Sequence, residues 1–197
     1  GRYKLGHWTR RSTDGARTWE EPVRVPPTTP YGPIQRSDGR LMFVGIETNQ
    51  GRPEGNGHIL AAESRDDGRN WLTVGRVNMY PPYQGDAADG YAYLCEPHVV
   101  EVAPGRLLGM ARYEEVPRAP ERCRLWQFRS DDGGKTWTEP ESTGILVDAG
   151  LSCRRTLQRL DEIGIAPEGI HAICLTHEHS DHRTGLATLQ RKLGVPL

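Results

Sequence analysis

The chain has 197 residues, of which 36% are hydrophobic and 26% are charged, and it contains 23 Gly and 15 Pro. This balance favours a turn-rich β protein over a helical bundle, and it is not extreme enough for a disordered chain. A formal net charge of -1 excludes a strong overall field toward nucleic acid or membranes, and no apolar run reaches the ~20 residues that span a bilayer.

One octet occurs three times. It reads S-T-D-G-A-R-T-W at 12–19, S-R-D-D-G-R-N-W at 64–71 and S-D-D-G-G-K-T-W at 130–137. Asp at the third position can accept backbone N–H bonds inside a tight turn, Gly supplies a residue with positive φ, and Trp can pack onto the adjacent sheet. We therefore expect three hairpin turns in which Asp14, Asp66 and Asp132 have structural rather than catalytic roles.

Short strand-like segments separated by Gly, Pro and Asp turns surround these octets. We expect a strand ending at Arg36, a turn at 37–40 and a returning strand at 41–46; segments 98–102 and 107–113 repeat this plan. Such spacing is typical of antiparallel β-sheet, and a repeat of roughly 50 residues with about four strands is typical of a propeller blade. The sequence therefore predicts a mostly β fold with about three blades.

The third octet matches the Asp-box (BNR repeat) pattern S-x-D-x-G-x-T-W at every position, whereas the first has Ala16 in place of the Gly and the second has Asn70 in place of the Thr. With these octets, residues 1–143 resemble the sialidase (neuraminidase) β-propeller family. A second match is the segment that carries Glu96 and, further on, Arg112. The resemblance implies an exo-α-sialidase type of glycoside hydrolase that needs no cofactor and acts on a sialylated glycan or a related sugar. It implies that Arg112 is one of three arginines that clamp the sugar carboxylate, and that Glu96 assists a nucleophilic Tyr.

Two considerations weigh against a complete site in this segment. A strand-end ion pair is the structural alternative for Glu96 and Arg112. The resemblance also places the first clamp arginine and the acid/base Asp before the first octet, and the Tyr and the third arginine well after the last one. We therefore expect the sialidase-like site to be incomplete.

After Gly144 the pattern changes to strand, helix, strand, helix. We expect a strand at 145–148, a helix that begins after Ser152 and ends at Gly164, a strand at 170–176, a helix at 185–192 and the start of a further strand at 194–197. Leu157, Leu160 and Ile163 are the apolar positions of the first helix and recur at three-residue steps. This alternation predicts an α/β unit rather than another blade.

The second of these strands is followed by T-H-E-H-S-D-H at 176–182. Imidazole and carboxylate are ligands that zinc prefers. His177, His179, Asp181 and His182 match the signature H-x-H-x-D-H, and Asp148 matches a V-D-A-G strand end. With these residues, 144–197 resembles an N-terminal fragment of the metallo-β-lactamase fold family, most closely its exonuclease-like branch.

That second resemblance implies one or two zinc ions in a hydrolase for which nucleic acid is a candidate substrate. His177 and His179 would bind one ion, and Asp181 with His182 the other, while further ligands would come from later in such a fold. Surface histidines without a metal are the structural alternative. We therefore expect zinc only where the site is completed.

The four cysteines are Cys95, Cys123, Cys153 and Cys174. None belongs to a C-x-x-C pair, and each lies among apolar or strand-like neighbours. We expect ordinary buried thiols rather than disulfides or metal ligands.

Taken together, the sequence predicts two incomplete domains, 1–143 and 144–197, as a truncated or chimeric reading frame would produce. The leading hypothesis is a sialidase-like hydrolase segment. The alternatives are a zinc-dependent hydrolase segment and a non-catalytic propeller that binds glycans or proteins. No membrane partner is expected. Three blades cannot close a ring, so we expect self-association through an open blade edge.

Overall fold

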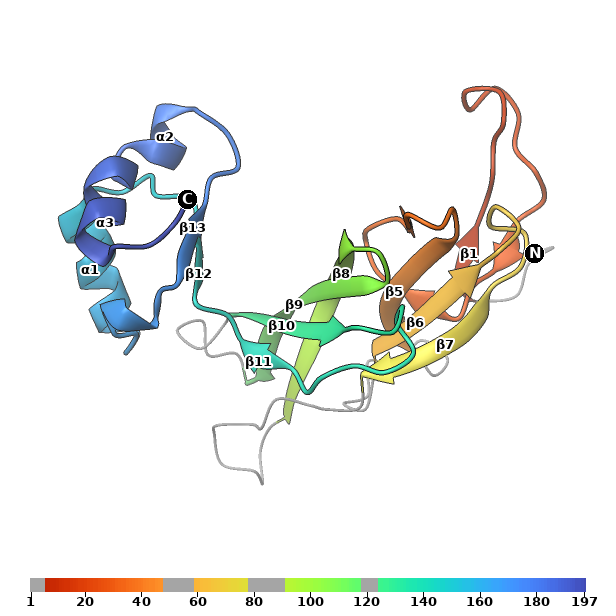
Figure 1. Ribbon diagram of the computed structural model, residues 1–197, viewed down its shortest axis with the longest axis horizontal. Helices are drawn as coiled ribbons and strands as arrows, with labels where there is room; N and C mark the ends of the chain where they lie inside the picture. The colour runs from red at the N-terminus through yellow and green to blue at the C-terminus, as the bar shows by residue number, and fades with distance from the viewer. Residues whose placement is uncertain (1–5, 48–58, 78–90, 118–123) are drawn as a thin grey trace. The chain divides into compact units, whose positions relative to one another are not determined.

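The computed structural model describes residues 6–47, 59–77, 91–117 and 124–197, and it is mostly β (Figure 1). The chain divides into two compact units, an N-terminal unit of residues 1–142 and a C-terminal unit of residues 143–197. Within the described ranges all the helices lie in the C-terminal unit, and none of them is long and apolar enough to cross a bilayer.

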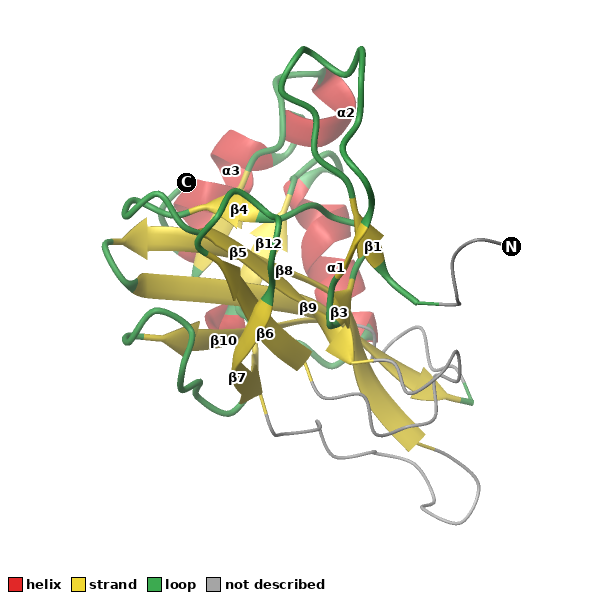
Figure 2. Ribbon diagram, turned by 90° about the vertical axis from the view of Figure 1, so that its right-hand side faces the viewer, coloured by secondary structure: helices red, strands yellow, loops and turns green. Residues whose placement is uncertain are grey.

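Three antiparallel sheets make up the described part of the N-terminal unit (Figure 2). The first sheet pairs two short strands, β1 (Trp8–Thr9) and β2 (Val23–Arg24). The second has the order β3-β5-β6-β7, with β4 also paired to β5, and the third has the order β11-β10-β9-β8. Their bounds are β3 (Pro27–Thr28), β4 (Ile34–Gln35), β5 (Leu41–Glu47), β6 (Ile59–Ser64), β7 (Leu72–Val77), β8 (Tyr91–Ala103), β9 (Arg106–Val116), β10 (Leu125–Ser130) and β11 (Glu141–Ser142).

Each octet connects the last two strands of its sheet, as a hairpin turn should. In the third octet, Thr136 donates from its backbone N–H to Asp132 Oδ1 (2.9 Å) and from its hydroxyl to Asp132 Oδ2 (2.7 Å). Trp137 Nε1 donates to the Gly134 carbonyl (2.9 Å), and its ring packs against Phe128. The predicted structural role of the octet aspartates is confirmed by the same pattern of bonds at Asp14 and Asp66.

The second sheet is buried on both faces. Successive residues of a strand point to opposite sides, and Met42, Phe43 and Val44 of β5 are all buried. Met42 and Val44 pack with residues of the third sheet, such as Phe128, whereas Phe43 packs on the other side with Val25 and Trp71. A sheet covered by apolar neighbours on both sides is what an internal propeller blade requires.

The third sheet differs in length from the prediction. The strands expected at 98–102 and 107–113 extend over 91–103 and 106–116, because charged residues that break the apolar pattern still pair across the sheet. Close packing in this sheet requires a glycine at position 109. A Cβ on Gly109 would lie 2.1 Å from the Phe128 ring.

The C-terminal unit contains a two-stranded parallel sheet and helices, as the α/β pattern predicts. Its strands are β12 (Ile145–Val147) and β13 (Ala172–Cys174). Its helices are α1 (Cys153–Glu162), a 3-10 helix (Pro167–Gly169), α2 (Ser180–Arg183) and α3 (Leu186–Leu193). Ala149, Ile173 and Leu189 form its buried centre.

Local signals placed the ends of α1 correctly. Ser152 Oγ accepts from the Arg155 backbone N–H (3.4 Å), and Gly164 has φ 68° just after the helix. Ile163, the last of the apolar positions expected in this helix, is the C-cap of α1 and is 37% exposed, because the helix ends one residue earlier.

Two further expectations for this unit were wrong. Residues 194–197 form no strand: Ile173 N–H donates to the Pro196 carbonyl (3.0 Å), and proline has no N–H with which to continue a ladder. The thiols are also not uniformly buried, because Cys153 is half-buried and Cys174 is exposed, whereas Cys95 in the N-terminal unit is buried. Cys123 lies outside the described residues.

Candidate functional sites

The first candidate site lies on β8 and β9. Cys95 pairs with Arg112 and His98 pairs with Met110, so Glu96 and Pro97 together face a single residue of β9 and form a β-bulge. Glu96 has φ 51°, a left-handed conformation that is uncommon for a residue other than glycine. The predicted pair, Glu96 and Arg112, therefore lies together at an irregular point of the sheet.

Arg112 contacts more groups than the sequence indicated. Its Nη2 is 3.4 Å from Glu96 Oε1 and 3.2 Å from Glu114 Oε1, and its Nε donates to Cys95 Sγ (3.3 Å). The Tyr93 hydroxyl donates to Glu114 Oε2 (2.6 Å). The hydrogen bond to Cys95 raises the pKa of Arg112, so its guanidinium stays charged. One cation between two carboxylates leaves this cluster with one net negative charge.

Glu114 was not among the predicted site residues, although strand alternation indicates it. A residue two positions after Arg112 on a strand faces the same side of the sheet. Arg112 and Glu96 are 42% and 43% exposed, and a pair this exposed contributes about 1 kcal/mol or less to stability. The ion pair is therefore present, but it is not needed to hold the fold together.

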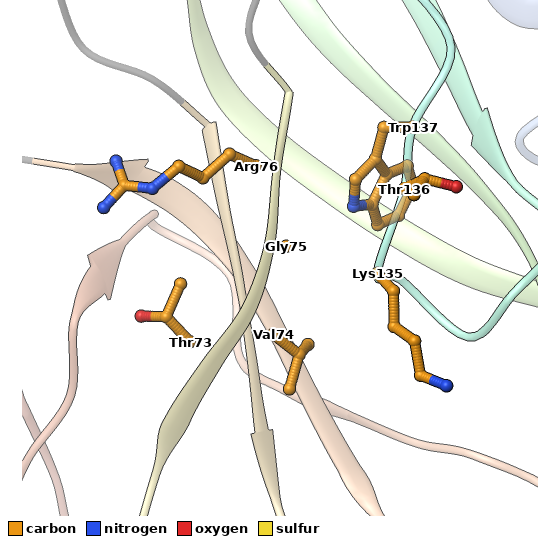
Figure 3. A pocket seen from close by; sticks show the side chains of 7 residues that line it. All are labelled: Thr73, Val74, Gly75, Arg76, Lys135, Thr136 and Trp137. Carbon is orange, nitrogen blue, oxygen red and sulfur yellow. The ribbon is translucent and has the colours of Figure 1, made fainter.

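A cavity of about 420 Å³ lies elsewhere in the N-terminal unit, between β7 and the third octet (Figure 3). Figure 3 shows Arg76 pointing away from Lys135, and Arg76 is paired with Glu47. The two cations therefore do not converge on a ligand. Glu96 and Arg112 do not line this cavity.

The second candidate site is organised around Asp148, which follows β12. Asp148 Oδ1 accepts from the Thr176 backbone N–H (2.8 Å), and Asp148 Oδ2 lies 2.8 Å from His182 Nδ1. These hydrogen bonds, that of the Thr176 N–H first, lower the pKa of Asp148 to about 2. The adjacent backbone packs directly on the histidine loop: a Cβ on Gly150 would lie 1.6 Å from the Asp181 carbonyl oxygen.

The four predicted ligands lie together on one loop, after β13 and at the start of α2. The ring centroids of His177 and His182 are 3.8 Å apart, and those of His177 and His179 are 4.8 Å apart. His182 Nε2 lies 3.7 Å from Asp181 Oδ2. These four residues are imidazole and carboxylate donors, which fit zinc in kind.

The arrangement does not complete a metal site. Over the described ranges, which include the whole C-terminal unit, no three His, Cys, Asp or Glu side chains are placed to hold one ion. Asp181 is 79% exposed and its carboxylate contacts only one ring nitrogen. The four candidate ligands therefore lie near one another, but they do not converge on one metal position.

Comparison with known proteins assigns both parts of the chain. Residues 2–159 match the family described as the BNR repeat-like domain, and residues 137–197 match the metallo-beta-lactamase superfamily. The exodeoxyribonuclease WalJ of Streptococcus pneumoniae serotype 2 is 45% identical over 65 residues. That match covers 33% of this chain and 24% of WalJ, so the chain spans about a quarter of this relative's length.

Solved structures align with more than two thirds of the chain. A Dyadobacter fermentans protein of unknown function aligns with a TM-score of 0.53 and 22% identity, over 70% of this chain and 38% of that one. The Penicillium chrysogenum α-L-arabinanase aligns with a TM-score of 0.49 and 21% identity, over 68% and 40%. The NanB sialidase of S. pneumoniae aligns with a TM-score of 0.45 and 16% identity, over 68% and 18%.

The family matches confirm the predicted fold class, a mostly β chain with a sialidase-like propeller part and a metallo-β-lactamase-like α/β fragment. The N-terminal match covers most of the sequence and includes all three octets. The chain therefore belongs to the BNR repeat-like domain family, and its C-terminal residues match the metallo-beta-lactamase superfamily.

Proposed function

We propose that residues 1–143 are a segment of a glycoside hydrolase of the exo-α-sialidase type, and that residues 144–197 are a separate segment of metallo-β-lactamase type. The substrate of the first segment is a sialylated glycan or a related sugar. The observation that supports it is the placement of Glu96 beside Arg112 at the β8 bulge. It also agrees with the membership of the chain in the BNR repeat-like family.

The chemistry of Arg112 suits recognition of a sugar carboxylate. A guanidinium presents paired N–H donors to a carboxylate. Nε and Nη2 of Arg112 face Cys95, Glu96 and Glu114, and no described residue takes Nη1 as a partner. Glu96 and Glu114 hold the side chain in place, and Glu96 takes the role of assisting the nucleophile. Because the cluster is negative by one charge, further cations must join Arg112 around an anionic sugar.

Hydrolysis of a fluorogenic sialoside tests this proposal. Release of the fluorophore by the purified chain, with most of that activity lost in Arg112→Ala, would support the proposal. Arg129→Ala is the matched control, because Arg129 is an exposed arginine on the neighbouring strand that pairs with Glu141. Absence of turnover by the wild-type protein would rule out the hydrolase function. Binding of sialylated glycans without turnover would favour the non-catalytic propeller instead.

A second function is supported for residues 144–197 by the metallo-beta-lactamase match of residues 137–197 and by the Asp148–His182 contact, and it agrees with the similarity of the chain to WalJ. We propose a zinc-dependent, exonuclease-like hydrolase segment with nucleic acid phosphodiesters as its substrate class. His177 and His179 would hold one ion, and Asp181 with His182 a second. Further ligands must close each site, since no three described donors converge.

The zinc content of the dialysed protein tests this second proposal. Retention of about one ion per chain or more after mild dialysis, with a clear loss in His177→Ala, would support the proposal. His171→Ala is the matched control, since His171 is an exposed histidine of the same unit outside the loop. Zinc content below one ion per chain, or equal content in both variants, would exclude a working metal site.

A further inference from the structure

Thr176 is the residue through which the histidine loop and Asp148 share hydrogen bonds. Its hydroxyl oxygen lies 2.9 Å and 2.8 Å from the two carboxylate oxygens of Asp148. The same oxygen lies 3.0 Å from His177 Nδ1 and 3.3 Å from His182 Nδ1. One hydroxyl thus faces a carboxylate and two imidazoles at once.

Counting donors and acceptors fixes the direction of these bonds. An ionised carboxylate can only accept hydrogen bonds, and a threonine hydroxyl has one proton to donate and two lone pairs with which to accept. The Thr176 proton therefore goes to Asp148. Toward the imidazoles the hydroxyl oxygen can then act only as an acceptor, so His177 Nδ1 must carry a hydrogen.

His182 also carries a hydrogen on Nδ1, because this nitrogen contacts Asp148 directly. Its Nδ1 lies 2.8 Å from Asp148 Oδ2, and this oxygen can only accept. Neutral imidazole has one hydrogen, so a hydrogen on Nδ1 leaves the lone pair on Nε2. His182 Nε2 is the atom that lies toward Asp181.

We infer that Asp148, directly and through the Thr176 hydroxyl, holds both His177 and His182 as Nδ1–H tautomers whose Nε2 lone pairs are free for a ligand. Thr176 is a positioning residue, because it would affect a bound zinc ion only by orienting His177. The tautomer assignment stands by itself, whereas its consequence for zinc affinity depends on the zinc site proposed above. Removing such a supporting contact typically weakens metal binding about 10- to 100-fold.

Thr176→Val and Thr176→Ser form a matched pair for the test. Valine has nearly the same shape as threonine without the hydroxyl, and serine retains it. The full-length, metal-free chain is labelled with ¹⁵N-histidine and studied by NMR at about pH 8, where an ordinary imidazole is neutral. Signals of His177 and His182 are assigned by their loss in His177→Ala and His182→Ala. Zinc affinity of each protein is measured by competition with a chromogenic chelator.

We expect His177 and His182 of the wild type and of Thr176→Ser to carry hydrogen on Nδ1. In Thr176→Val, His177 should gain the Nε2–H tautomer and zinc affinity should fall about 10- to 100-fold. If Thr176→Val does not fold, Asp148→Asn tests the same point, because its amide can donate and should release both rings. A wild-type His177 with hydrogen on Nε2, or a tautomer unchanged in these variants, would overturn the inference. A wild type with these tautomers that binds no zinc would instead reject the proposed zinc site.

Discussion

At the scale of single residues, carboxylates organise both candidate sites. Glu114 accepts from the Tyr93 hydroxyl and contacts Arg112, which fixes the direction of the guanidinium. Asp148 binds Thr176 and His182, so the loop that carries four donors is attached to the end of β12. In each case a further carboxylate contacts the residues of the motif and positions them.

The octet aspartates give a prediction about acid stability. Hydrogen bonds from Thr136, its backbone N–H first, lower the pKa of Asp132 from 3.8 to about 2. Because the folded-state pKa is below the unfolded one, the stabilisation is present above about pH 4 and is lost as pH falls toward 2. We expect the stability difference between wild type and Asp132→Asn to shrink over that range, as measured by urea unfolding followed by tryptophan fluorescence.

Asp131→Asn is the control for this series, because Asp131 is the neighbouring exposed aspartate and pairs with Arg106. Its unfolding should follow that of the wild type closely, since an exposed ion pair contributes little. A difference between wild type and Asp132→Asn that stays constant from pH 4 to pH 2 would contradict the assignment.

Individual residues also show which features could be predicted from the sequence and which could not. The octets were predicted correctly because each turn is closed by bonds between residues at most four positions apart, such as Asp132 and Thr136. Glu114 and Thr176 were not predicted as site residues, because their partners come from strand register. Thr176 meets Asp148 only because β12 and β13 lie in parallel with Val147 opposite Cys174.

At the scale of elements, Arg36 connects the second and third sheets of the N-terminal unit. Arg36 follows β4, is 7% exposed, and donates to Glu63 of β6 (3.0 Å) and to the Gly133 carbonyl of the third octet (3.3 Å). Its Nε lies 3.7 Å from Glu101 of β8. Buried charges that are paired across two sheets help to fix the position of one sheet against the other.

We expect Arg36→Ala to lower the free energy of unfolding by about 3 kcal/mol, the lower end of the range for breaking a buried ion pair, because Glu63 retains other cations. Arg40→Ala is the matched control. Arg40 contacts the same carboxylate, but it is 40% exposed, so its loss should cost less than about 1 kcal/mol. Urea unfolding measures both, and equal effects of the two substitutions would contradict the role of Arg36.

Element boundaries were harder to predict than the elements themselves. The bulge at Glu96 could not be read from local pattern, because it depends on how β8 pairs with β9. Residues 194–197 looked like a strand by composition, but Pro196 limits them to one bond with β13. Predictions from sequence pattern are correct where hydrogen bonds join residues that are close in sequence. They fail where pairing with another strand determines where an element begins and ends.

At the scale of the whole molecule, unfolding of the two units can be followed by different spectroscopic signals. All five Trp residues lie in the N-terminal unit, and the helices of the described residues lie in the C-terminal unit. Tryptophan fluorescence therefore follows one unit, and helical circular dichroism mainly the other. Self-association through an open blade edge stays a prediction, which sedimentation velocity over a concentration series would check.

Zinc should stabilise only the unit that binds it. A ligand that binds the native state raises its unfolding temperature by mass action. We expect zinc to raise the midpoint of the circular dichroism transition and to leave the fluorescence transition unchanged. His177→Ala should abolish the shift. A zinc shift seen by fluorescence, or one that persists in His177→Ala, would place the ion elsewhere.

The central claim for the N-terminal segment is that Arg112 recognises a sugar carboxylate. Calorimetric binding of sialic acid and of its methyl ester tests it most directly, because the ester removes only the charge. A hydrogen bond to a charged group is worth about 1.5–3 kcal/mol, so the wild type should prefer the acid by roughly 10- to 150-fold. Arg112→Ala should lose this preference and Arg129→Ala should keep it. Equal affinity of the wild type for both compounds, or no binding of either, would contradict the claim.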